Sequence, residues 1–225
     1  MKRFLVIVPV AVAALVALAG TGTAADPTCL GETATVSGTG SIIGTTGPDV
    51  IVGSAGTDTI FGLGGGDLIC GGLGGDYIYA GSGSDFVAGD NGFAPPTAGG
   101  PDYVDGGSGD DEVFGEGGDD TLRGGSGNDA PVAGMFGDDL VYGDAGSDFA
   151  VGGFGHDVVS GGDGNDGVFG GYDSDSVSGD RGDDYVDGDL PGVPFVDATP
   201  HQDTCSGGSG GDFLANCELV RGASE

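Results

Sequence analysis

Aspartate recurs every nine residues through most of this chain, and no other feature constrains its fold as strongly. The recurrence pauses after Asp85, slips by one residue before Asp139 and pauses again after Asp184. A fixed period of this kind is typical of a solenoid, in which one short structural unit stacks on copies of itself. Seventeen aspartates keep the phase: Asp49, Asp58, Asp67, Asp76, Asp85, Asp102, Asp111, Asp120, Asp129, Asp139, Asp148, Asp157, Asp166, Asp175, Asp184, Asp203 and Asp212.

Each phased aspartate has the same kind of neighbours. Gly stands two residues before nearly every one, and an apolar, usually β-branched residue stands two residues after most of them. The consensus Gly-Gly-x-Gly-x-Asp-x-apolar-x is almost unaltered in residues 161–169. The apolar positions are Ile51, Ile60, Ile69, Ile78, Val87, Val104, Val113, Leu122, Val141, Val159, Val168, Val177 and Val186.

This unit predicts a tight turn followed by a short strand. Glycines supply the backbone dihedrals that other residues avoid, so six residues form the turn, and the last three form a strand with its central side chain on one face. Strands stacked about 4.8 Å apart build a thin continuous core. Two units per coil alternate the chain between two parallel sheets. A helix is excluded because glycine costs about 1 kcal/mol at each helical position.

The charge of the chain demands an external cation if these turns are to stack. The sequence has 54 Gly and 36 acidic residues against five Lys or Arg, for a net charge of −31. Such composition is usual in disordered chains, but the regular apolar spacing favours a fold. One coil is eighteen residues, so Asp49 would lie over Asp67 and Asp58 over Asp76. A Ca²⁺ ion between stacked carboxylates, with backbone carbonyls completing its ligands, removes the repulsion, whereas Mg²⁺ demands stricter geometry.

The repeated nonapeptide resembles that of the RTX, or hemolysin-type, calcium-binding repeat family, over about residues 44 to 215. The resemblance implies an all-β fold, a right-handed parallel β-roll, with each phased aspartate named above as a calcium ligand. The chain is also similar to small secreted actinobacterial members of that family, which place cysteines as this chain does at Cys29, Cys70, Cys205 and Cys217. Many family members carry a C-terminal export signal, whereas this chain has the pattern of an N-terminal one.

The N-terminus has the layout of a secretory signal peptide. Lys2 and Arg3 precede an apolar run over residues 4–19, and small residues follow to Ala25. The alternative is a membrane anchor, but the run is shorter than the roughly 20 residues that a span needs, and Pro9 interrupts it. We therefore expect a secreted protein with no membrane span after cleavage. The expected organisation is a signal peptide over 1–25, an N-terminal cap over 26–43, a roll over 44–215 and a C-terminal cap or tail over 216–225.

Four cysteines in an exported chain are candidates for two disulfides, and four allow three pairings. We predict the pairs Cys29–Cys70 and Cys205–Cys217. Cys70 has an outward strand position, where it can pin an N-terminal cap, and Cys205 has a core position that Cys217 can reach to close the far end. Open ends of stacked sheets need such cover because exposed edges pair with other chains.

Three irregularities interrupt the repeats. Loops are expected near 89–101 and 188–202, the first in place of a half-coil because Asp102 follows Asp85 by 17 residues. With that interruption, pairing each aspartate with the one a coil later gives eleven calcium sites. Asp173 stands where neighbouring turns have Gly, so we predict a positive φ there and late filling of the Asp157–Asp175 site. At outward positions, Phe61 and Tyr79 lie one coil apart and predict stacking between strands.

These observations predict a non-catalytic, extracellular calcium-binding protein whose folding is coupled to binding several Ca²⁺ ions. The alternative is a calcium-stiffened adhesin or scaffold that presents its outer strands to a cell-surface or protein partner, which the sequence does not identify. An enzyme is disfavoured because no nucleophile is accompanied by a base. Nucleic acid is excluded as a partner because phosphate binding needs a basic surface.

Overall fold

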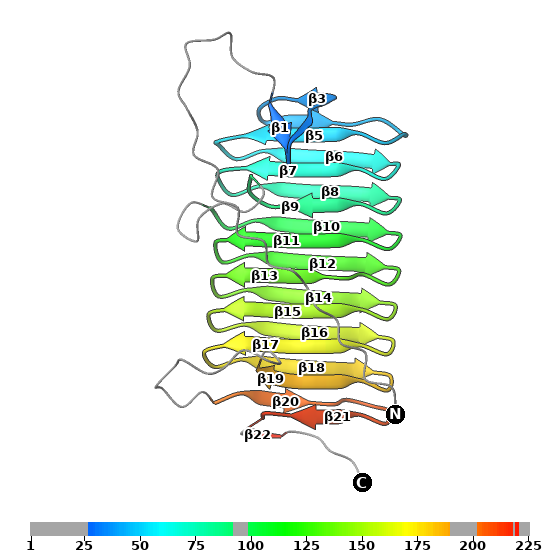
Figure 1. The fold of residues 1–225 in the computed structure, drawn as a ribbon, viewed down its shortest axis with the longest axis vertical. Helices are drawn as coiled ribbons and strands as arrows, with labels where there is room; N and C mark the ends of the chain where they lie inside the picture. The colour runs from blue at the N-terminus through cyan, green and yellow to red at the C-terminus, as the bar shows by residue number, and fades with distance from the viewer. Residues whose placement is uncertain (1–26, 92–98, 190–201, 218, 221–225) are drawn as a thin grey trace.

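Each nine-residue unit forms one strand and one turn, and successive strands alternate between two parallel ten-stranded sheets (Figure 1). The computed structural model describes residues 27–91, 99–189, 202–217 and 219–220. Odd-numbered strands from β3 to β21 form one sheet, and even-numbered strands from β4 to β22 form the other. The predicted fold class, an all-β parallel roll of two sheets, is confirmed. The predicted signal peptide, residues 1–25, lies outside the described residues.

The strands are short and nearly uniform. The odd sheet contains β3 (Val36–Ser37), β5 (Val50–Ser54), β7 (Leu68–Gly72), β9 (Phe86–Ala88), β11 (Glu112–Gly117), β13 (Val132–Phe136), β15 (Phe149–Phe154), β17 (Gly167–Tyr172), β19 (Tyr185–Asp189) and β21 (Phe213–Ala215). The even sheet contains β4 (Ser41–Ile43), β6 (Thr59–Gly64), β8 (Tyr77–Ser82), β10 (Tyr103–Ser108), β12 (Thr121–Ser126), β14 (Leu140–Ala145), β16 (Val158–Asp163), β18 (Ser176–Arg181), β20 (Thr204–Ser206) and β22 (Leu219–Val220).

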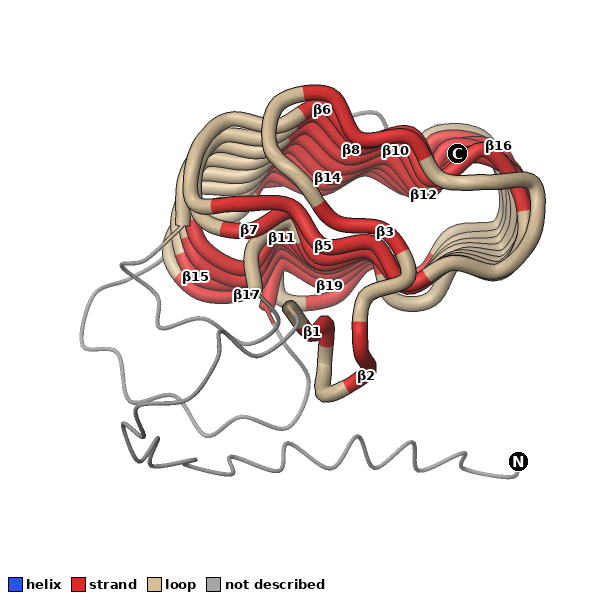
Figure 2. The backbone as a smooth tube through the Cα atoms, turned by 90° about the horizontal axis from the view of Figure 1, so that it is seen from above, coloured by secondary structure: helices blue, strands red, loops and turns tan. Residues whose placement is uncertain are grey.

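A single column of apolar side chains fills the space between the two sheets. Viewed along the roll, the sheets face one another and the turns stack at both edges (Figure 2). Every apolar position predicted from the repeat is buried in this column, from Ile51 to Val186. Because each strand contributes one such side chain, the core is thin, and its stability depends on the number of stacked coils.

The first insertion corrects our expectation of a loop in place of a half-coil. That expectation placed Asp85 and Asp102 a full coil apart. In the structure β9 follows Asp85 in the odd sheet and β10 follows Asp102 in the even sheet, so the two residues are half a coil apart. Strand β10 pairs directly with β8, with Tyr103 aligned to Tyr77. A spacing of 17 residues is close to two units, so counting alone gave the wrong register.

The two other irregularities also leave the strand pairing intact. Strand β20 pairs with β18, with Thr204 aligned to Ser176 across the second predicted loop. The extra residue before Asp139 is absorbed between Asp129 and β13, since Val132 aligns with Val113. The roll is therefore continuous in register from β3 to β21.

Disulfides close both ends of the roll, and both predicted pairings are confirmed. Cys29 bonds to Cys70 and Cys205 bonds to Cys217. Cys29 belongs to β1 (Thr28–Cys29), which pairs antiparallel with β2 (Glu32–Thr33) and covers a small apolar cluster outside the odd sheet. Cys205 lies in the main core. In the described part of the chain, no helix of the length and apolarity needed to span a membrane is present.

Aromatic side chains stack along the outer faces. The rings of Phe61 and Tyr79 lie 5.3 Å apart with an interplanar angle of 9°, which confirms the predicted stacking. A second stack joins Phe136, Phe154 and Tyr172 at successive turns, with ring centroids 5.2 and 4.3 Å apart. These contacts repeat at the coil spacing and add to the stability of the sheets.

Candidate metal sites

The seventeen phased aspartates form two columns, one along each edge of the roll. One column precedes the odd strands and the other precedes the even strands. Within a column, the backbone N–H of each aspartate donates to Oδ1 of the aspartate in the next coil, at 2.7–3.2 Å. The odd column contains Asp49, Asp67, Asp85, Asp111, Asp129, Asp148, Asp166, Asp184 and Asp212. The even column contains Asp58, Asp76, Asp102, Asp120, Asp139, Asp157, Asp175 and Asp203.

These hydrogen bonds make fifteen neighbouring pairs, four more than the eleven counted from the sequence. The additional pairs are the ones that span the insertions. Asp76 donates to Asp102 and Asp85 to Asp111, each across 26 residues. Asp175 donates to Asp203 across 28 residues. The ladder is unbroken because the strands stay in register.

The carboxylates of the columns are buried, with Asp212 half-buried at the C-terminal end. Their second oxygen is the unusual one. In thirteen of them, from Asp67 to Asp184, Oδ2 is buried without a hydrogen-bond partner. Buried carboxylate oxygens are normally paired, because leaving a charged group unsatisfied costs more than a neutral one. A row of thirteen such oxygens indicates that a ligand belongs beside them.

The first two turns are different because the chain itself satisfies them. The N–H of Thr45 donates to Oδ2 of Asp49, and the N–H of Ser54 donates to Oδ2 of Asp58, both at 2.6 Å. From Asp67 onward, no such donor reaches Oδ2. The N-terminal turns are therefore self-satisfied, whereas the following turns present an open oxygen.

Each open oxygen faces a backbone carbonyl across a glycine. A Cβ built on Gly106 would lie 2.8 Å from Oδ2 of Asp111 and 2.6 Å from the carbonyl oxygen of Gly124 in the next coil. The same arrangement recurs at Gly161, with Asp166 at 2.5 Å and the carbonyl of Gly179 at 2.9 Å. Glycine keeps this space clear, so that a carboxylate oxygen and a carbonyl oxygen approach one point.

Burial and mutual repulsion raise the pKa of these acids. Burial, followed by the charges of neighbouring aspartates, raises the pKa of Asp102 to about 9 and those of Asp139 and Asp175 to about 8. At the odd edge the pKa of Asp129 is raised to about 7 for the same reasons. At neutral pH the acids are therefore poised between accepting a proton and accepting a cation.

A second, outer ladder runs beside each column and was not anticipated from the sequence. It uses the residue just before each phased aspartate. Oδ1 of Asp110 accepts the N–H of Asn128, and Oδ1 of Asn128 accepts the N–H of Ser147. His156 continues the equivalent ladder at the other edge, where its Nδ1 accepts the N–H of Ser174. The polar residues Asp, Asn, Ser and His at this position were the available signal.

Six segments of the chain match the family model of the RTX calcium-binding nonapeptide repeat, at residues 36–69, 43–78, 64–93, 97–130, 133–168 and 160–190. Together they cover well over half of the sequence. The chain belongs to this family. No curated protein matches the sequence of this RTX protein.

Calcium, which the family description names, fits the residues of the RTX roll. Ca²⁺ takes six to eight oxygen ligands from carboxylates and carbonyls, and the open positions present these two kinds of oxygen. No group of three or more His, Cys, Asp or Glu side chains converges as a metal cluster among the described residues. That finding is consistent with a site in which one side chain per turn acts together with backbone carbonyls. It does not suit metals that need nitrogen or sulfur ligands.

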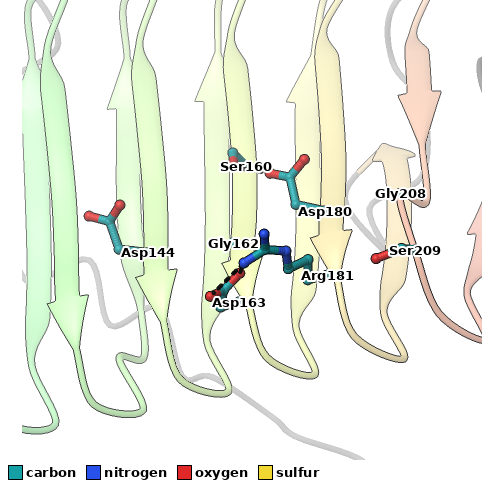
Figure 3. A pocket seen from close by; sticks show the side chains of 8 residues that line it. All are labelled: Asp144, Ser160, Gly162, Asp163, Asp180, Arg181, Gly208 and Ser209. Atoms are coloured by element: carbon teal, nitrogen blue, oxygen red, sulfur yellow. Dashed lines mark hydrogen bonds and ion pairs between the residues drawn. The ribbon is translucent and has the colours of Figure 1, made fainter.

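The acids on the outer surface of the RTX roll are different because they have side-chain partners. A depression of about 450 Å³ lies beside the even sheet and contains Asp144, Asp163, Asp180 and Arg181 (Figure 3). Asp163 pairs with Arg181 at 2.9 Å, and Asp144 pairs with Arg123 at 2.6 Å. Asp180 accepts hydrogen bonds from serine hydroxyls. These carboxylates are satisfied within the chain and need no added ion.

Proposed function

We propose that this chain is an extracellular, non-catalytic calcium-binding protein whose folding is coupled to Ca²⁺ binding. The seventeen phased aspartates supply the side-chain ligands, and the glycine turns supply carbonyl ligands. One observation carries the proposal: thirteen buried Oδ2 atoms lack a partner, and they lie in two regular columns. The RTX family membership of the chain supports the same ligand.

Coupling to folding follows from the charge of the columns. Only Arg123 and Arg181 of the five basic residues lie within the described part of the chain, and both are paired with surface acids. The columns therefore have no cationic partner of their own. Ionised at neutral pH, stacked buried carboxylates oppose the compact state. Because the ligands converge only when coils are stacked, binding free energy contributes directly to folding.

The two disulfides support an oxidising, extracellular location, since such bonds form and persist outside the cytosol. Cleavage of residues 1–25 as a signal peptide belongs to the same proposal. The non-catalytic assignment is supported by the RTX family, whose repeats are structural calcium-binding units. In this function, the aspartates hold the ion and the ion holds adjacent coils together.

Far-UV circular dichroism during calcium titration tests the proposal. The mature chain, freed of metal with a chelator at pH 7.5, should lack the β signal and gain it at about 10⁻⁴ to 10⁻³ M free Ca²⁺, the range of extracellular modules. The same concentration of Mg²⁺ should leave the spectrum unchanged. A full β spectrum in excess chelator would contradict coupled folding, and calorimetry without heat of binding would contradict calcium binding itself.

A further inference from the structure

Asp90 is a buried acid outside the nine-residue phase. It precedes the first insertion, and its side chain is 0% exposed. Oδ2 accepts the N–H of Gly117 at 3.2 Å, while Oδ1 is buried without a hydrogen-bond partner. Nothing in the repeat consensus requires an acid here, because most turns have Gly or a small residue at the equivalent position. The unpartnered Oδ1 indicates that Asp90 faces a ligand of its own.

Glu116 occupies the same position in the next coil. Strands β9 and β11 pair with Ala88 aligned to Phe114, and two further residues in that register bring Asp90 beside Glu116. Glu116 is also buried, at 4% exposed. Other residues at this turn position are not: Leu63 is 48% exposed, and Asp144 reaches out to Arg123. Two buried acids stacked at this position are thus a local feature of the first insertion.

Carbonyl oxygens complete the surroundings on both sides of the insertion. Oδ2 of Asp90 and the carbonyl oxygen of Gly117 both approach the point that a Cβ on Gly99 would occupy. Oδ2 of Asp102 does the same at Gly89, with the carbonyl oxygen of Gly115 2.7 Å from that point. The chain leaves the turn after Asp90 and returns at Gly99. The oxygens therefore come from residues before the insertion, after it and in the following coil.

Electrostatics gives this place an unusual need for a cation. Burial, then repulsion from Glu116, Asp120 and Asp76, raises the pKa of Asp90 to about 7. Asp102, beside it, has its pKa raised by burial and by the charges of Asp120, Asp76 and Asp90. Every charged group that contributes to these shifts is an acid. No basic side chain within the described residues offsets them, since Arg123 and Arg181 are paired elsewhere.

We propose that Asp90 and Glu116, together with Asp102, form a calcium site that is distinct from the repeat sites and clamps the base of the insertion at residues 91–98. The site would bind Ca²⁺ more tightly than the repeat sites, because affinity for this ion rises with the number of charged ligands and with rigidity. The inference rests on the proposed calcium binding of the roll. Its ligands, however, are residues that the repeat does not supply.

Ion counting in calcium buffers tests the proposal. The mature protein is dialysed against a series of buffered free Ca²⁺ concentrations, and bound calcium is measured by atomic emission. The double variant D90N/E116Q is compared with D144N/D180N, which removes two acids from the same turn position where they have protein partners. Circular dichroism at saturating Ca²⁺ confirms that each variant folds.

The wild type and the control should retain one ion at free concentrations where the other ions have dissociated. D90N/E116Q should lose that ion, or need at least about tenfold more free Ca²⁺ to hold it, and should bind one ion fewer at saturation. Identical curves for the wild type and D90N/E116Q would overturn the proposal and indicate that the two acids share a proton. Equal losses in both double variants would indicate a general charge effect and also overturn it. A wild type that binds no calcium at any concentration would instead refute the proposed function.

Discussion

The backbone N–H of Asp76 donates to Oδ1 of Asp102 at 2.7 Å, although 26 residues separate the two aspartates in the sequence. In uninterrupted parts of the roll the same bond spans 18 residues, as between Asp58 and Asp76. The difference equals the eight residues from 91 to 98. The turn geometry on either side of the insertion is that of an ordinary repeat, so the ladder does not require the inserted residues.

Deleting residues 91–98 should therefore preserve the roll. Joining Asp90 to Gly99 restores the nine-residue spacing between Asp85 and Asp102, and the strand pairing of β8 with β10 already ignores the insertion. We expect the deletion variant to reach the wild-type β signal, with a calcium midpoint within about twofold of the wild type, because surface insertions cost little loop entropy. Circular dichroism during titration measures both. A variant that fails to fold at saturating Ca²⁺ would mean that the inserted residues hold the coils together.

Replacing Asp139 with Asn should raise the calcium concentration at the folding midpoint. The amide oxygen of Asn can still accept the N–H of Asp120, which preserves the ladder bond. The unpartnered Oδ2 is replaced by an NH₂ group that cannot bind a cation. The matched control is D138N, one residue earlier on the exposed outer ladder. Equal midpoints for D139N and D138N would argue against Asp139 as a ligand.

Replacing Asp173 with Gly should lower the calcium midpoint. The predicted positive φ at Asp173 is confirmed, with a value of 75°, in a turn where the neighbouring repeats have Gly. Relief of this conformation should stabilise the loaded roll by about 1 kcal/mol. Tyr172, which we expected to crowd the turn, instead stacks on Phe154 at 4.3 Å and should be left in place. A higher midpoint in D173G would identify Asp173 as a ligand, and the expected late filling of the Asp157–Asp175 site would then be wrong.

Acid should fold the metal-free protein in part. The folded-state pKa values of Asp102, Asp139 and Asp175 lie at about 8 to 9, above the ordinary value of 3.8. Protonation therefore favours the folded state: this stabilisation is complete below about pH 4 and is lost as the pH rises through 8 to 9. In chelator, the β signal should be stronger at pH 5 than at pH 8, with light scattering as the control for aggregation. The opposite order would show that these carboxylates are not buried together without metal.

Calcium should act in the opposite direction on the same groups. Because the ion binds ionised carboxylates, loading must release the protons that their raised pKa values retain near neutral pH. The calcium midpoint should then fall as pH rises from 6 to 8, and calorimetry in buffers of different ionisation enthalpy should detect proton release. A midpoint independent of pH over this range would exclude a role for the aspartates with raised pKa values.

The sequence by itself determined the repeating elements of this protein. Glycine at fixed places allows the turn, a β-branched residue such as Val168 selects the strand face, and a period of nine sets both, so the core was predictable from Ile51 to Val186. Both disulfides followed from the positions of Cys70 and Cys205 in that period. These features depend on contacts within one unit or between units at a constant spacing, and a regular sequence specifies such contacts directly.

Only the tertiary structure decided what happens where the spacing changes. A separation of 17 residues between Asp85 and Asp102 suits either a shortened full coil or an expanded half-coil, and pairing of β8 with β10 selects the second. The burial of Asp90 and Glu116 was likewise invisible, because neither acid keeps the nine-residue phase and their proximity depends on which coils are adjacent. Hydrogen bonding between neighbouring coils, summed over both sheets, fixes that adjacency. It is a property of the stacked roll that no single repeat contains.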